Sequence, residues 1–115
     1  MDTDALAQRI KSRFDHNQSK RVLREKYRAK MIFTYNGGMW KASPELALHC
    51  NLCIANGHFE PVLQDVHENP VKVDAAELKE LVMQRWQEQM NAWYVEQDDL
   101  FSRQEQSKEF EAKQE

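Results

Sequence analysis

The chain has 115 residues, of which 41% are hydrophobic and 30% are charged, a composition typical of one small globular domain with a modest core. It contains no run of about 18 apolar residues, so no membrane-spanning helix is expected, and its acidic N-terminal stretch lacks the apolar block of a secretory signal. Two cysteines without such a signal predict free thiols and a cytoplasmic location.

The net charge of −3 hides a strong asymmetry along the chain. Residues 1–42 contain ten Lys/Arg and four Asp/Glu, and residues 43–115 contain six and fifteen, so the two parts carry +6 and −9. A basic front is expected in a chain that binds a polyanion at one end. It is equally expected where the two halves attract each other, within one chain or between copies.

The first predicted element is a helix that begins at the capping residues near Asp2, in which Leu6, Ile10 and Phe14 recur every four residues. The polar cluster DHNQS at 15–19 favours caps and turns, because its short polar side chains compete for nearby backbone groups. It predicts a break, followed by a second helix to about Lys30.

The stretch from residue 9 to residue 30 carries the most concentrated positive charge of the sequence. Nine of the ten Lys/Arg in residues 1–42 lie between Arg9 and Lys30. Lys20, Arg24 and Arg28 share one helical face at spacing four, to which Lys26 and Lys30 add. Phosphate binding needs several cations on one face; the alternative is an ordinary solvated face.

The middle of the chain predicts two hairpins around a short helix. Strand formers from Ile32 run into Asn36-Gly37, which supplies the positive φ angles of a tight hairpin turn. Ser43-Pro44 then opens a helix that ends at Asn56-Gly57. Residues 59–73 predict a second hairpin, with Val66 in its first strand and a turn at 68–70.

Asp74 caps a long predicted helix over 74–102, with Glu77 in the capping-box position. Its apolar residues follow at spacings of four and three along one seam. The polar residues 103–115 have little to bury and are expected to fray. The predicted fold is therefore mainly α with two small β-hairpins, as a single domain over residues 1–102.

The stretch HCNLCIANGH places Cys50 and Cys53 three residues apart with histidines on either side. A zinc site would need two further ligands from His49, His58 or His67, and none has a standard spacing. A redox pair belongs at a helix N-terminus, and this pair lies at least one turn inside a helix. Burial as core residues is the preferred interpretation, with no metal and no cofactor.

The sequence contains no recognisable catalytic motif. A Gly-rich phosphate loop, HExxH and GxSxG are all missing, and the carboxylates are scattered along solvated helix faces. The chain is therefore predicted to be non-enzymatic, with no small-molecule substrate and no membrane partner.

Two sets of aromatic residues have a functional and a structural interpretation. Phe33, Tyr35 and Trp40 on the first hairpin could stack on bases, although burial against the helices is preferred. The apolar seam of the long helix is longer than the short N-terminal half of the chain could cover. This suggests that the seam pairs with another copy or with another protein. The interface residues of that pairing would be Trp86, Met90 and Trp93.

From about residue 19 to residue 95, the order of helices and hairpins resembles the winged-helix plan. YNGGMWKASPEL (35–46) and NPVKVDAAELKELVMQRWQEQMNAW (69–93) resemble small uncharacterised proteins of marine metagenomes and marine T-even-type phages. This resemblance implies a winged-helix-like domain that binds nucleic acid, located in the host cytoplasm if a phage encodes the protein. Two features depart from the plan: residues 36–60 leave little room for two helices, and the presumed recognition helix over 44–56 has no Lys or Arg.

The leading hypothesis is binding of nucleic acid, DNA in particular, through phosphate contacts with weak sequence preference. Lys72 would assist from the wing hairpin, and the other predicted contacts come from the basic helix: Arg13, Lys20, Arg21, Arg24, Arg28 and Lys30. The rival hypothesis is a structural or assembly protein that forms a homodimer or larger oligomer through its long helix, with its basic end on an acidic partner surface.

Overall fold

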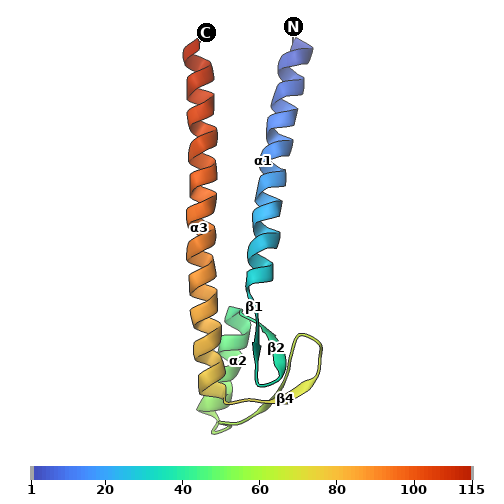
Figure 1. The fold of residues 1–115 in the computed structure, drawn as a ribbon, viewed down its shortest axis with the longest axis vertical. Helices are drawn as coiled ribbons and strands as arrows, with labels where there is room; N and C mark the ends of the chain where they lie inside the picture. Colours follow the sequence, from blue (N-terminus) through green and yellow to red (C-terminus); the bar gives the residue numbers. More distant parts are fainter. Residues whose placement is uncertain (1, 115) are drawn as a thin grey trace. The chain divides into compact units, whose positions relative to one another are not determined.

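A computed structural model of the chain describes the backbone of residues 2–114 and the side chains of residues 3–13 and 15–103. The elements in chain order are α1 (Asp2–Lys30), β1 (Ile32–Tyr35), β2 (Gly38–Lys41), α2 (Pro44–Ala55), β3 (Val62–Gln64), β4 (Pro70–Lys72) and α3 (Ala75–Gln114) (Figure 1). The prediction of a mainly helical fold with two small antiparallel hairpins and a long C-terminal helix is confirmed.

The chain falls into two compact units. Unit 1 combines Met1–Tyr27 with Trp93–Glu115, and unit 2 comprises Arg28–Ala92. Each unit is described by itself, and a single domain over residues 1–102 stays a prediction. In the described part of the chain, no helix has both the length and the apolar character needed to cross a membrane.

In unit 1, α1 and α3 lie side by side and run antiparallel (Figure 1). The Tyr27 ring stacks on Trp93 with centroids 5.9 Å apart, and the His16 ring stacks on Phe101 at 4.8 Å. Among the described side chains of α1, Leu23 and Tyr27 are buried, at 8% and 4% exposure. The contact between the helices is therefore narrow, and most of the α1 surface is left open to solvent.

The predicted break at residues 15–19 is wrong, because α1 is one continuous helix of 29 residues. The cluster contains neither glycine nor proline, and each of its polar residues costs only about 0.7 kcal/mol or less in a helix interior. The stacking of His16 on Phe101 adds a tertiary contact that holds this stretch in the helix.

The first hairpin of unit 2 forms as the sequence predicts. β1 pairs with β2 in the register Ile32↔Lys41 to Tyr35↔Gly38, and Asn36 and Gly37 adopt φ values of 51° and 79°. Two successive positive φ angles define the tight turn whose twist matches that of the strands. Gly38 has a different role, because a Cβ there would lie 3.1 Å from the Trp40 indole and 3.1 Å from Val71.

The predicted limits of α2 are also confirmed. The Ser43 hydroxyl accepts a hydrogen bond from the Leu46 N–H at 3.2 Å, with Pro44 at the first helical position. Asn56 is the C-cap, and Gly57 follows with φ of 80°. Both ends follow local rules of helix capping.

The second hairpin is shorter than predicted, since β3 ends at Gln64 and Val66 lies in the loop. The reason is Asp65, whose carboxylate accepts hydrogen bonds from the backbone N–H groups of Met39, His67 and Asn69 at 3.0–3.1 Å. These hydrogen bonds lower the pKa of Asp65, and the bond from the Met39 N–H has the largest effect. The backbone after Gln64 therefore bonds to the Asp65 carboxylate instead of extending the hydrogen-bond ladder between β3 and β4.

The core of unit 2 is formed by side chains from both hairpins, α2 and the first turns of α3. Trp40 is 1% exposed, and its indole N–H donates to the Tyr35 carbonyl at 2.9 Å. The buried cluster comprises Met31, Trp40, Ala42, Cys50, Leu63, Val73, Ala75, Leu78 and Val82.

The start of α3 is set by Asp74, whose carboxylate accepts from the N–H groups of Ala76 and Glu77, both at 3.1 Å. The Glu77 carboxylate accepts a hydrogen bond from the Tyr35 hydroxyl at 3.1 Å. The helix continues to Gln114, beyond the predicted end at residue 102. Fraying of the polar residues 103–115 stays a prediction.

Candidate nucleic-acid interface

Five cations of unit 1 gather on one side of α1. At 100° per residue, they fall within an arc of roughly 120°. This set, called the basic arc below, comprises Arg9, Arg13, Lys20, Arg21 and Arg24. Between Arg9 and Arg24 the one acidic residue is Asp15, which projects outside the arc, so over this length one face of the helix carries positive charge alone.

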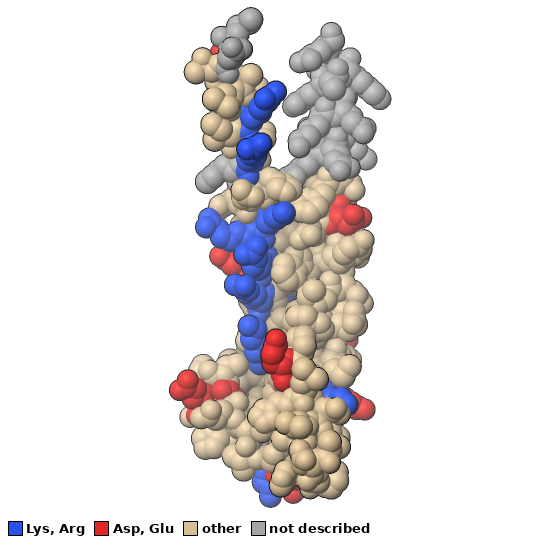
Figure 2. Space-filling view, turned by 180° about the vertical axis from the view of Figure 1, so that it is seen from behind, with Lys and Arg blue, Asp and Glu red and all other residues tan. Residues whose placement is uncertain are grey.

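The side chains of the basic arc are open to solvent, because α1 packs against α3 along a narrow line only. All five side chains are exposed, and the Lys and Arg residues of α1 form a band along the helix (Figure 2). Arg9 was not among the predicted contacts. Arg9 and Arg13 both precede the predicted break at residues 15–19, and only a continuous helix aligns them with Lys20, Arg21 and Arg24.

The charges of the basic arc are not neutralised within the part of the chain whose side chains are described. None of its five residues forms an ion pair with a carboxylate there. The Arg21 guanidinium donates to the Gln18 amide oxygen at 2.7 Å, and the Lys20 ammonium lies 5.5 Å from the centroid of the Phe101 ring. Both partners are uncharged, so the positive charge remains available to an anion.

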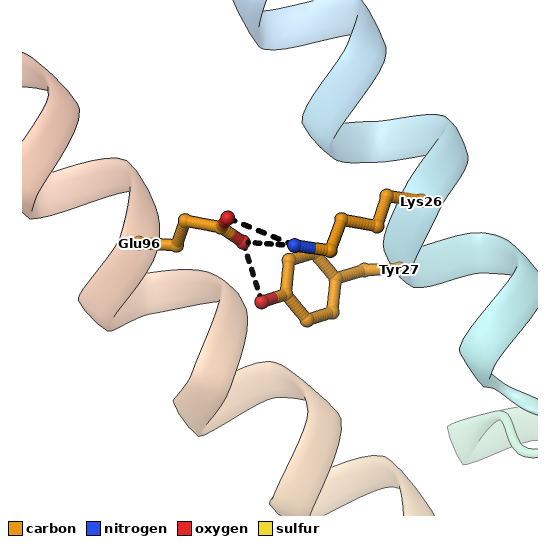
Figure 3. A network of polar contacts seen from close by, with 3 residues as sticks. All are labelled: Lys26, Tyr27 and Glu96. Atoms are coloured by element: carbon orange, nitrogen blue, oxygen red, sulfur yellow. Dashed lines mark hydrogen bonds and ion pairs between the residues drawn. The ribbon is translucent and has the colours of Figure 1, made fainter.

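Lys26 differs from its neighbours on α1, and its inclusion in the basic face was wrong. Its ammonium lies 2.9 and 3.0 Å from the two carboxylate oxygens of Glu96. One of these oxygens also accepts from the Tyr27 hydroxyl at 2.6 Å (Figure 3). The hydrogen bonds to Glu96 raise the pKa values of both Lys26 and Tyr27. Lys26 therefore joins α1 to α3 inside unit 1.

The other three predicted contacts belong to unit 2 and are not counted in the basic arc. Arg28 and Lys30 occupy the last turn of α1, where the Lys30 carbonyl accepts from the Arg85 guanidinium at 3.4 Å. Lys72 on β4 lies 3.6 Å from a Glu60 carboxylate oxygen, with both side chains 69% exposed. A pair so exposed is screened by solvent and holds Lys72 only weakly.

The aromatic residues of the first hairpin are packed in unit 2, as preferred from the sequence. Trp40 is buried, and Phe33 and Tyr35 pack partly buried against the core. The Arg85 guanidinium lies 5.9 Å from the centroid of the Phe33 ring. This packing favours the structural interpretation of the three rings over stacking on bases.

The two cysteines are core residues, and the packing interpretation is confirmed. Cys50 is fully buried, Cys53 is partly buried against the same cluster, and both are free thiols. Burial raises the pKa of the Cys50 thiol, which disfavours the reactive thiolate. Across the described residues, no group of three or more His, Cys, Asp or Glu is placed to hold a metal ion.

The residues predicted to pair the long helix with another molecule have contacts within the chain. Trp86 and Met90 pack partly buried against the core of unit 2. Trp93 stacks on Tyr27 inside unit 1. These contacts account for part of the apolar seam without a second molecule, and pairing through it stays a prediction.

Comparison of the chain with protein-family models, with curated proteins and with solved structures finds no match. Any function must therefore be inferred from the surface chemistry of the two units.

Proposed function

We propose that this protein binds nucleic acid, duplex DNA in particular, through contacts between the basic arc and phosphate groups. One observation carries the proposal: five exposed cations share one face of a continuous helix, with no acidic residue on that face between Arg9 and Arg24. Such a face neutralises phosphates and releases their counterions, which is the main source of sequence-independent affinity for nucleic acids.

The length and rigidity of α1 suit this role. From Arg9 to Arg24 the helix spans about 22 Å, at about 1.5 Å per residue. The charges are presented on regular secondary structure, so no loop must be ordered when the ligand binds. A negative net charge of −3 for the whole chain does not oppose this, because at physiological salt an exposed charge acts only over about 8 Å.

The proposed contacts carry little sequence information. α2, the presumed recognition helix of a winged-helix-like arrangement, contains neither Lys nor Arg, and it is the one helix between the two hairpins. Lys72 on β4, at the position of a wing, would add at most one phosphate contact. The proposal therefore keeps the winged-helix-like assignment as an expectation and rests on the basic arc alone.

The packed aromatic residues favour duplex over single-stranded ligands. Proteins that hold single strands add stacking of bases on exposed rings to their electrostatic contacts. Phe33, Tyr35 and Trp40 pack against the core of unit 2, so stacking on these three rings of the first hairpin is not expected. Phosphate contacts remain, and a duplex presents them at the higher density.

A fluorescence anisotropy titration tests the proposal. The probes are a duplex of roughly 30 base pairs and a single strand of the same length, each measured between about 50 and 200 mM salt. Five phosphate contacts predict a slope of log K against log salt of about −4.5 for the duplex. Binding that is independent of salt, or no binding to either probe at micromolar protein and low salt, would contradict the proposal.

A further inference from the structure

Unit 2 has an apolar groove between α2 and the first turns of α3. Its volume is about 440 Å³. Lys79 supplies its one charged group, and that ammonium donates to the Asn51 side-chain oxygen at 3.0 Å. The lining residues are Ser43, Pro44, Ala47, Leu48, Asn51, Lys79, Val82, Met83, Trp86 and Gln87.

A ridge of exposed leucines stands beside this groove on the same helix. Leu48, which also lines the groove, is 68% exposed, and Leu52 one turn later is 62% exposed. Met83 on the opposite wall is 54% exposed. Large apolar side chains grouped on one face in this way are typical of a surface that is covered by a protein partner.

We propose that this surface binds a second copy of the chain, with the leucine ridge of each copy in the groove of the other. A two-fold interface requires one surface that complements itself, and here the ridge and the groove are neighbours on one helix. If the two α2 helices run antiparallel with the axis at Leu48, symmetry places Leu52 of one copy opposite Pro44 of the other. It places Glu45 opposite Asn51 in the same way.

The charges of the surface fit this register. Glu45 is exposed in the first turn of α2, and it forms no ion pair among the residues whose side chains are described. Asn51 is the residue that holds the Lys79 ammonium. Each Glu45 would therefore meet the Lys79 of the second copy, and symmetry would form this ion pair twice.

This inference does not depend on the proposed binding of nucleic acid, since the basic arc belongs to unit 1. It shares only Trp86, which lines the groove, with the predicted pairing through Trp86, Met90 and Trp93, and it uses α2 as the central element. An unrelated protein partner in the groove is the alternative occupant, and the oligomeric state of the pure protein distinguishes the two.

Sedimentation velocity of the full chain over a range of concentrations tests the proposal. We expect a dimer for the wild type and a monomer for Leu48→Asp at the same concentrations. The matched control is Val62→Asp, because Val62 on β3 is 63% exposed and does not line the groove. A wild type that stays monomeric up to roughly 100 μM, or a Leu48→Asp variant that dimerises like the control, overturns the proposal.

Charge reversal tests the register. Glu45→Lys and Lys79→Glu should each raise the dimer dissociation constant by roughly tenfold, because each creates two like-charge contacts. The double variant should restore the wild-type constant. Circular dichroism of each variant establishes that unit 2 remains folded. A double variant no better than the weaker single one would overturn the antiparallel register.

Discussion

The two units differ in how much of their surface they bury. Unit 2 surrounds Trp40, Leu78 and Val73 with side chains from two hairpins and two helices, and each of these residues is at most 1% exposed. Unit 1 joins two helices along a narrow line of aromatic and polar contacts, with Leu23 and Tyr27 as the buried ones among the described side chains of α1.

This difference bears on function. The narrow packing of unit 1 leaves one face of α1 free for the basic arc, and a ligand there would meet exposed positive charge. Unit 2 has a buried apolar core, and in addition Leu48 and Leu52 are exposed beside a groove. We therefore expect electrostatic recognition by unit 1 and apolar recognition by unit 2.

The largest effect is expected from removing the centre of the unit 2 core. Trp40→Ala should lower the free energy of unfolding by about 3–5 kcal/mol, because it leaves a cavity and removes the bond to the Tyr35 carbonyl. Urea unfolding followed by circular dichroism measures the change. Tyr94→Ala in unit 1, where Tyr94 is 71% exposed, is the control and should cost about 0.5 kcal/mol or less. Equal effects would contradict the contrast in packing.

A smaller effect is expected at the turn of the first hairpin. Gly37→Val should destabilise unit 2 by about 1–3 kcal/mol, because Gly37 has a φ of 79° that a β-branched residue adopts only under strain. No other atom lies within 4 Å of the position of a Cβ, so the cost is conformational and not steric. Gly37→Asn should be tolerated much better, since asparagine accepts positive φ. Similar losses for both variants would contradict the turn geometry.

The subtlest effect concerns the alkaline stability of unit 1. Glu96 raises the pKa values of Lys26 and Tyr27 above their ordinary values of 10.5 and 10.0. Both protonated forms are favoured by folding, so their contribution is complete below these values and is lost as the pH rises through the raised ones. Thermal unfolding between pH 9 and 12 should show this loss, and it should be weaker in Glu96→Gln. Identical profiles for wild type and variant would contradict the network.

Where local chemistry decides the structure, the sequence was sufficient. Asn36-Gly37 predicted the first hairpin, Ser43-Pro44 predicted the start of α2, and Asp74 predicted the start of α3. In each case a turn or cap depends on a few neighbouring residues and agrees with burial of the adjoining apolar side chains.

Where distant residues decide the structure, the sequence was not sufficient. The bond between Lys26 and Glu96 joins positions 70 residues apart, and no local pattern reveals it. Asp65 ended β3 early through a bond to Met39 on another hairpin. The groove combines α2 with α3 and was likewise not predicted. The basic arc was predictable in part. Its cations are evident in the sequence, but which of them share one face depends on α1 being continuous through residues 15–19.

The most direct test of phosphate binding by the basic arc compares the salt dependence of duplex binding in two variants of equal charge. Arg13/Arg24→Gln removes two cations of the arc, and Lys11/Lys41→Gln removes two exposed cations outside it. The first variant should flatten the slope of log K against log salt by about 1.8, and the second should leave it close to that of the wild type. Equal slopes in the two variants would contradict the assignment of the ligand to this face of α1.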